Sequence, residues 1–152
     1  MAGRAGDDAP QGLEGFAHET LRGQTAVLLK ARDVLHPHVV LTGEHMTFAV
    51  GDPEDSLAAA RRFLAEQVRS GRCALSYEAQ LPGESTRTLI VEAHEVGLPH
   101  SVRFGRRFRR TRLTRRCRLI GEPFEMEPGA PLLVDPAVAD APSNGDEIQF
   151  PR

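Results

Sequence analysis

The segment 73–81, in which apolar and polar residues alternate, constrains the fold of this chain more than any other feature. Its apolar positions are Cys73, Leu75, Tyr77, Ala79 and Leu81. A period of two is typical of a strand with one buried face. Pro82-Gly83-Glu84-Ser85 has the composition of a turn, and Thr88–Val96 has that of a second strand. Because the connection is short, the two segments predict an antiparallel hairpin.

A helix is predicted over Pro53–Ser70. Asp52 is suited to the N-cap, Pro53 to the first helical position, and Gly71 to the residue after the last turn. Apolar residues recur at helical spacing, so one face of this helix is expected to be buried. They are Leu57, Ala60, Leu64 and Val68.

Shorter elements are predicted on either side of these. They are a helix over Leu13–Arg22 ended by Gly23, strands over Thr25–Ala31, Val39–Thr42 and His45–Val50, and a further strand that begins near Ser101. Several strands with one long helix indicate an α+β fold. We expect an antiparallel sheet with one main helix packed on one face, in a single domain.

The 152 residues match the size of one domain. Residues 1–12, rich in Gly, Ala, Asp and Pro, are expected to be a disordered N-terminus, and residues 13–135 to form the domain. Six of the eleven prolines follow Gly121, which excludes a regular helix or a central strand there. Residues 136–152, rich in proline and acids, are expected to be a flexible tail.

Composition and apolar runs restrict the class of protein. The longest apolar runs have about four residues, far short of a membrane-spanning helix, and the first residues lack the apolar core of a secretory signal. Cys73 and Cys117 form neither a disulfide framework nor a zinc site, and both are expected to be buried. We therefore expect a cytoplasmic protein that does not bind membranes.

The segment 103–118 departs most from average composition, with nine arginines and no acid in sixteen residues. The rest of the chain has ten basic and 21 acidic residues, so a total net charge of −2 hides an uneven distribution. We define the arginine run as these nine residues. They are Arg103, Arg106, Arg107, Arg109, Arg110, Arg112, Arg115, Arg116 and Arg118.

The apolar residues in and beside the segment 103–118 favour a β-hairpin over a helix or a disordered arm. Val102, Phe104 and Phe108 share one strand parity, whereas Leu113, Cys117 and Leu119 share the other, which predicts a turn between about Phe108 and Leu113. Arg106, Arg107, Arg109 and Arg110 would then lie near the tip. Arg112, Arg116 and Arg118 would line the solvent face.

The arginine run predicts a non-enzymatic binding module that docks a polyanion, with DNA or RNA as the leading partner. The nine arginines are the predicted nucleic-acid-binding residues. The alternative is a protein-interaction or homo-oligomeric domain whose arginines meet carboxylates. Those carboxylates include the seven acids that follow Gly121, which would neutralise the run by folding back over it.

Histidines support a third reading, a small metal-dependent or acid–base enzyme. His36, His38, His45 and His94 are spaced so that some could hold a metal, and Glu92 shares a strand face with His94. No HExxH or CxxC accompanies them, and no GxSxG, P-loop or dinucleotide fingerprint is present. The sequence therefore assigns no catalytic residue, metal ligand or cofactor.

Overall fold

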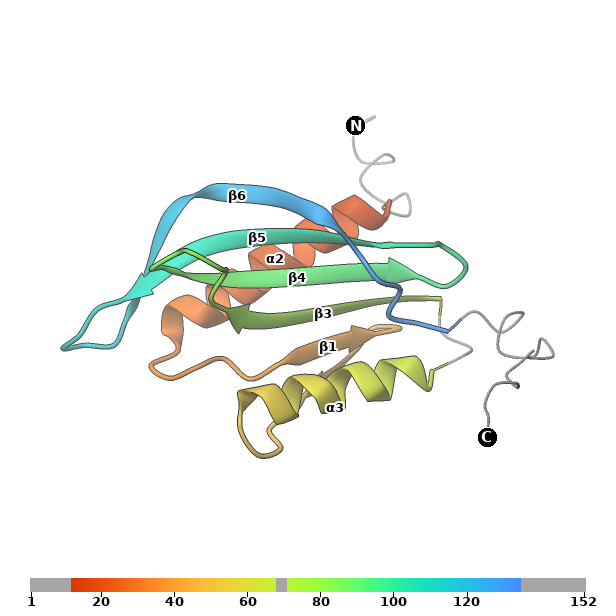
Figure 1. The fold of residues 1–152 in the computed structure, drawn as a ribbon, viewed down its shortest axis with the longest axis horizontal. Coiled ribbons are helices and arrows are strands. Elements are labelled where there is room, and N and C mark those ends of the chain that lie inside the picture. The colour runs from red at the N-terminus through yellow and green to blue at the C-terminus, as the bar shows by residue number, and fades with distance from the viewer. Residues whose placement is uncertain (1–11, 68–70, 135–152) are drawn as a thin grey trace, which may run out of the picture.

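The computed structural model describes residues 12–67 and 71–134, which form one antiparallel sheet with two helices (Figure 1). The strand order is β2-β1-β3-β4-β5-β6, and all neighbours are antiparallel. The predicted α+β class with an antiparallel sheet in a single domain is confirmed. The elements are α2 (Leu13–Lys30), β1 (His38–Leu41), β2 (Glu44–Thr47), α3 (Pro53–Ala65), β3 (Arg72–Ala79), β4 (Arg87–Glu95), β5 (Ser101–Arg110) and β6 (Cys117–Gly129).

The hairpin predicted over 73–96 forms as β3 and β4, with Leu75 opposite Glu92 and Tyr77 opposite Ile90. The prediction that only one face of β3 is buried is wrong, because Ala74 and Ser76 are buried as well. The reason is that helices lie against both faces of the sheet. The alternating pattern therefore marked a change of side-chain type, and not a change from buried to exposed.

Helix α2 corrects the reading of the N-terminal region, where a short helix and a strand over Thr25–Ala31 were predicted. One helix of 18 residues runs through Gly23 to Lys30. Ala17, Leu21 and Leu28 are buried against the sheet, so the helical stripe continues past the glycine. Packing of this stripe outweighs the preference of Thr, Val and Leu for strands.

Helix α3 begins where the sequence predicts. The Asp52 carboxylate accepts from the Asp55 backbone N–H at 2.8 Å, and the Asp55 carboxylate accepts from the Asp52 N–H at 3.3 Å, which completes a capping box. The helix ends at Ala65, short of the predicted Ser70, and residues 68–70 lie outside the described residues. It is the shorter of the two helices, so the main helix of the fold is α2.

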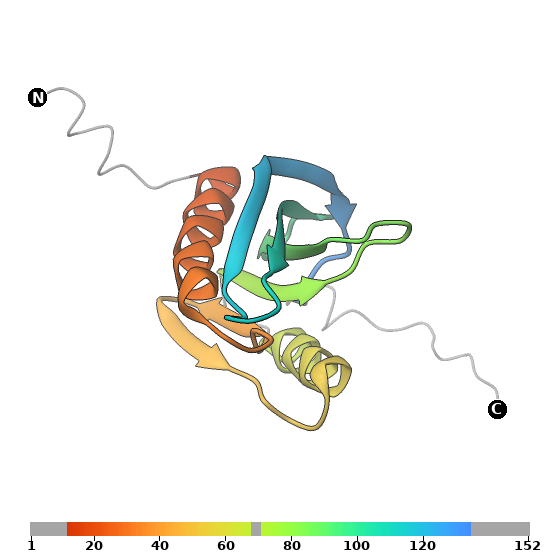
Figure 2. The same cartoon turned by 90° about the vertical axis from the view of Figure 1, so that its left-hand side faces the viewer.

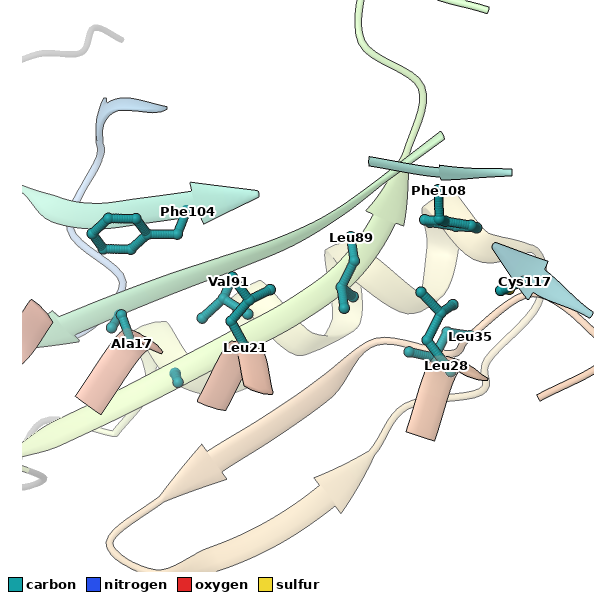
Figure 3. Packing of buried hydrophobic residues seen from close by; sticks show 11 residues of the cluster. Ala17, Leu21, Leu28, Leu35, Leu89, Val91, Phe104, Phe108 and Cys117 are labelled. Atoms are coloured by element: carbon teal, nitrogen blue, oxygen red, sulfur yellow. The ribbon is translucent and has the colours of Figure 1, made fainter. Parts of the chain in front are cut away.

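Two apolar clusters fill the two sides of the sheet. On one side, α2 packs on Leu89, Val91, Phe104 and Phe108 (Figure 3). On the other side, Ala60 and Leu64 of α3 pack on β1 and β3, and the segment after β6 adds Leu132 and Leu133. The predicted inward parity of Phe104 and Phe108 is confirmed, and so is the burial of both cysteines.

Strand β6 is an edge strand, which is where a sheet tolerates proline. Its pairing with β5 shifts register twice, and Gly121, at φ 74°, lies in the longer shift. Irregularities of this kind bend a strand. Figure 2 shows the resulting curl of β5 and β6 over the sheet.

Two of the predicted segments lie almost wholly outside the described residues. These are the N-terminus, 1–12, of which only Gly12 is described, and the tail, 136–152. Among the residues that the structure does describe, no helix is long and apolar enough to cross a membrane.

Candidate nucleic-acid interface

The arginine run lies on the β5–β6 hairpin, and its loop is residues 111–116. This loop comes later in the chain than the predicted turn between Phe108 and Leu113, so Arg106–Arg110 belong to β5 and not to the tip. The loop is closed by the Thr111 N–H, which donates to the Arg116 carbonyl at 2.8 Å. Leu113, predicted to share the buried parity of Cys117, is 96% exposed at the tip.

Arg110 anchors the hairpin to the middle of the sheet. Its guanidinium donates two hydrogen bonds to the Glu78 carboxylate, at 3.1 and 2.5 Å, and one to the Asp33 carbonyl at 2.7 Å. The Glu78 side chain is only 1% exposed and also accepts from the Leu35 N–H at 2.7 Å. The hydrogen bonds that Arg110 donates to Glu78 raise the pKa of Arg110. Arg110 is therefore a structural cation.

Arg107 is bound on the opposite face of β5. It donates twice to the Glu84 carboxylate, both bonds at 2.9 Å, and its guanidinium lies 4.2 Å from the centre of the Phe124 ring. The hydrogen bonds from Arg107 hold the pKa of Glu84 below its usual value. Glu84 was predicted only as a turn residue, so its role as a counter-charge was missed.

Three further arginines of the run also have partners within the domain. Arg103 lies 3.9 Å from the Glu92 carboxylate, and Arg106 donates to the Gly121 carbonyl at 2.9 Å. Arg115 has a left-handed φ of 60°. Its side chain donates to the Asp33 carboxylate at 3.0 Å and to the Arg32 carbonyl at 2.9 Å. Five of the nine arginines thus hold the hairpin in place.

The remaining four arginines are exposed and form no ion pair with another described residue. We call them the open arginines: Arg109, Arg112, Arg116 and Arg118. Arg109 and Arg118 are register partners across β5 and β6. Like charges directly opposite each other in a sheet are unfavourable, so this pair has a physical preference for an anionic ligand.

Neutralisation of the run by the chain that follows Gly121 is not observed within the described residues. Strand β6 does lie beside β5, but the acids paired with the run are Asp33, Glu78, Glu84 and Glu92. They come from the loop after α2, from β3, from the turn after β3, and from β4. The later acids of the tail lie outside the described residues.

The residues of the enzyme reading do not converge. Glu92 accepts two hydrogen bonds from Arg61, at 2.9 and 2.8 Å, and one from the Tyr77 hydroxyl. His94 is fully buried; its Nδ1 accepts from the Leu132 and Leu133 backbone N–H groups, and its Nε2–H donates to the Leu98 carbonyl at 3.0 Å. The two side chains therefore share a face but serve separate structural networks.

The remaining histidines lie elsewhere. His38 and His45 contact each other on β1 and β2, whereas His36 is exposed in the preceding segment. Within residues 12–67 and 71–134, no three His, Cys, Asp or Glu side chains are grouped closely enough to hold a metal ion. Burial raises the pKa of Cys73 to about 12, and burial also raises the pKa of Cys117, so neither thiol is activated.

Comparison of the chain with protein-family models, with curated proteins and with solved structures finds no match.

Proposed function

We propose that this protein is a non-enzymatic binding module that docks a nucleic acid on the open arginines. The observation that supports the proposal is the cross-strand pair of Arg109 and Arg118, two exposed cations without a described counter-charge. Arg112 and Arg116 extend the same charge into the loop. Guanidinium groups bind phosphate oxygens in bidentate fashion and keep their charge at every relevant pH.

The arginines that are bound within the domain support this proposal, because they fix the hairpin before any ligand binds. Arg107 and Arg110 are each held by two hydrogen bonds to one carboxylate. A ligand that meets a fixed two-stranded ribbon costs less conformational entropy on binding than one that must order a loose arm. Phosphate contacts carry no sequence information, so the proposal implies no base specificity.

The proposal is tested by fluorescence anisotropy with labelled single-stranded DNA, duplex DNA and RNA at low and moderate salt. A double variant, Arg109→Ala with Arg118→Ala, is compared with Arg22→Ala with Arg62→Ala, which removes two exposed arginines from the helices. We expect binding to weaken at least tenfold in the hairpin variant and less than threefold in the control. No binding of any probe at low salt, or equal losses in both variants, would overturn the proposal.

A protein-interaction or homo-oligomeric role is the second candidate, and it rests on Leu113. This side chain is 96% exposed at the end of the basic loop, where it offers an apolar contact surrounded by charge. If the hairpin binds a second copy, sedimentation velocity will show self-association that Leu113→Ser abolishes. A monomer at all concentrations would reject the homo-oligomer.

A further inference from the structure

The β1–β2 hairpin brings two imidazoles together on the sheet face that α2 covers. In its register, His38 lies opposite Thr47 and Val40 opposite His45, so the two histidines are diagonal neighbours on one face. Val40 packs against the apolar cluster beneath α2, which identifies that face. His45 lines a pocket together with Glu19 of α2, and His38 lines the adjacent pocket.

The two nearest ring nitrogens are separated by a distance suited to a shared metal ion. His38 Nε2 lies 3.0 Å from His45 Nδ1, and the ring centres are 5.2 Å apart. With metal–nitrogen bonds of about 2.0–2.1 Å, two nitrogens at this separation subtend an angle of roughly 95° at the ion. That angle is near the right angle of tetragonal coordination and well below the tetrahedral angle, so the geometry favours Cu²⁺ or Ni²⁺ over Zn²⁺.

A hydrogen bond donated by His38 Nδ1 would leave Nε2 in the form a metal requires. His38 Nδ1 lies 3.2 Å from the Thr47 hydroxyl, and a proton on Nδ1 leaves the Nε2 lone pair directed at His45. Metal ligands in proteins are oriented in this way by a partner on the other ring nitrogen.

We propose that His38 and His45 chelate a divalent ion of tetragonal preference, Cu²⁺ or Ni²⁺, with water at the remaining positions. Without metal, the His45 Nδ1–H donates to His38 Nε2. On binding, both nitrogens donate lone pairs to the ion, and the His45 proton moves to Nε2, so no net proton is released. Since two protein ligands hold the ion, the site is dissociable, and it links β2 at the edge of the sheet to β1.

The experiment is calorimetric titration of the untagged full chain with Ni²⁺, with Cu²⁺ and with Zn²⁺. We expect one ion per chain, with Ni²⁺ bound more tightly than Zn²⁺. His38→Ala and His45→Ala should each weaken Ni²⁺ binding at least tenfold. The matched control is His100→Ala, which removes an exposed imidazole and should leave the affinity unchanged.

Thr47→Val separates ligation from folding, because it keeps both imidazoles and removes only the partner of His38 Nδ1. It should weaken Ni²⁺ binding about tenfold, as loss of an outer hydrogen bond does at metal sites. Circular dichroism checks that each variant folds. Absence of saturable Ni²⁺ and Cu²⁺ binding, an equal loss in the His100→Ala control, or tighter binding of Zn²⁺ than of Ni²⁺ would overturn the proposal.

Discussion

Removal of the Glu92 carboxylate tests the main buried ion network of the domain. The Glu92 side chain is 5% exposed and accepts hydrogen bonds from Arg61 and the Tyr77 hydroxyl, with Arg103 at 3.9 Å. In Glu92→Ala, Arg61 and Tyr77 lose their acceptor and Arg103 loses a nearby opposite charge, while the three side chains stay on three different elements. The network connects α3, β3, β4 and β5, so the loss is expected to affect the whole domain.

The expected loss of stability depends on how well water can hydrate each group after Glu92 is removed. The Arg61 side chain is 41% exposed and can be hydrated, so its contribution to the loss of stability is small. Tyr77 is 6% exposed and is left without its acceptor, whereas the Arg103 side chain, 25% exposed, loses a nearby opposite charge. A buried unsatisfied donor costs about 1–3 kcal/mol, so we expect Glu92→Ala to lower the free energy of unfolding by about 2–4 kcal/mol.

Urea denaturation followed by far-ultraviolet circular dichroism and by tyrosine fluorescence measures this loss. The chain has no tryptophan and one tyrosine, so the fluorescence reports the environment of Tyr77 alone. The matched control is Glu95→Ala on the same strand, whose side chain is 43% exposed and pairs with Arg72. It should cost less than about 1 kcal/mol. Equal losses in the two variants would refute the reasoning.

Four further outcomes can be tested. Burial raises the pKa of Glu92, but hydrogen bonds and charge from its partners outweigh it and hold the value below 4.5, so the stability advantage of wild type over Glu92→Ala is full above that pH. Acid titration of both proteins should show the advantage shrinking as pH falls further. Burial and the Glu92 charge raise the pKa of Tyr77 to about 12, so stability is lost as pH rises from 10 toward 12; phenolate absorbance with a midpoint near 10 in the folded protein would contradict this. Gly105→Ala places a Cβ 2.9 Å from Phe124 and should cost about 1–3 kcal/mol in thermal unfolding. Gly23→Ala meets no atom within 4 Å and should stabilise helix α2 by about 1 kcal/mol.

The parts of the fold that could be predicted are those in which neighbouring residues act together. The capping residues of α3 are adjacent in sequence, and the alternation over 73–81 is read within one strand. Gly23 was misread as a helix end because glycine often stops helices, but here its φ is not positive and no left-handed C-cap forms. Only the burial of Leu28 under the sheet, a contact with distant strands, continues the helix.

The candidate site could be predicted less well than the fold, because the arginines are distinguished by residues far away in sequence. Parity between Val102 and Leu119 correctly indicated a hairpin, which the structure extends over Ser101–Gly129. The partners of Arg107, Arg110 and Arg115 lie 23, 32 and 82 residues away, and no local pattern specifies them. The tip was misplaced since Leu113 was assumed to be buried, as an apolar residue near Cys117 would ordinarily be.

The division of the arginine run into arginines bound within the domain and open arginines changes the salt dependence expected for nucleic-acid binding. Arg110 cannot contact phosphate without breaking its two hydrogen bonds to the Glu78 carboxylate, which is 1% exposed and would keep only Arg87, at 3.3 Å, as a cationic partner. If only the four open arginines bind duplex DNA, the slope of log affinity against log salt should be about −3.6, since each phosphate contact contributes about −0.9. If all nine took part, the slope would be about −8. A measured slope near the larger value would mean that the ion pairs within the domain open on binding, and that the hairpin is a rearranging element and not a fixed one.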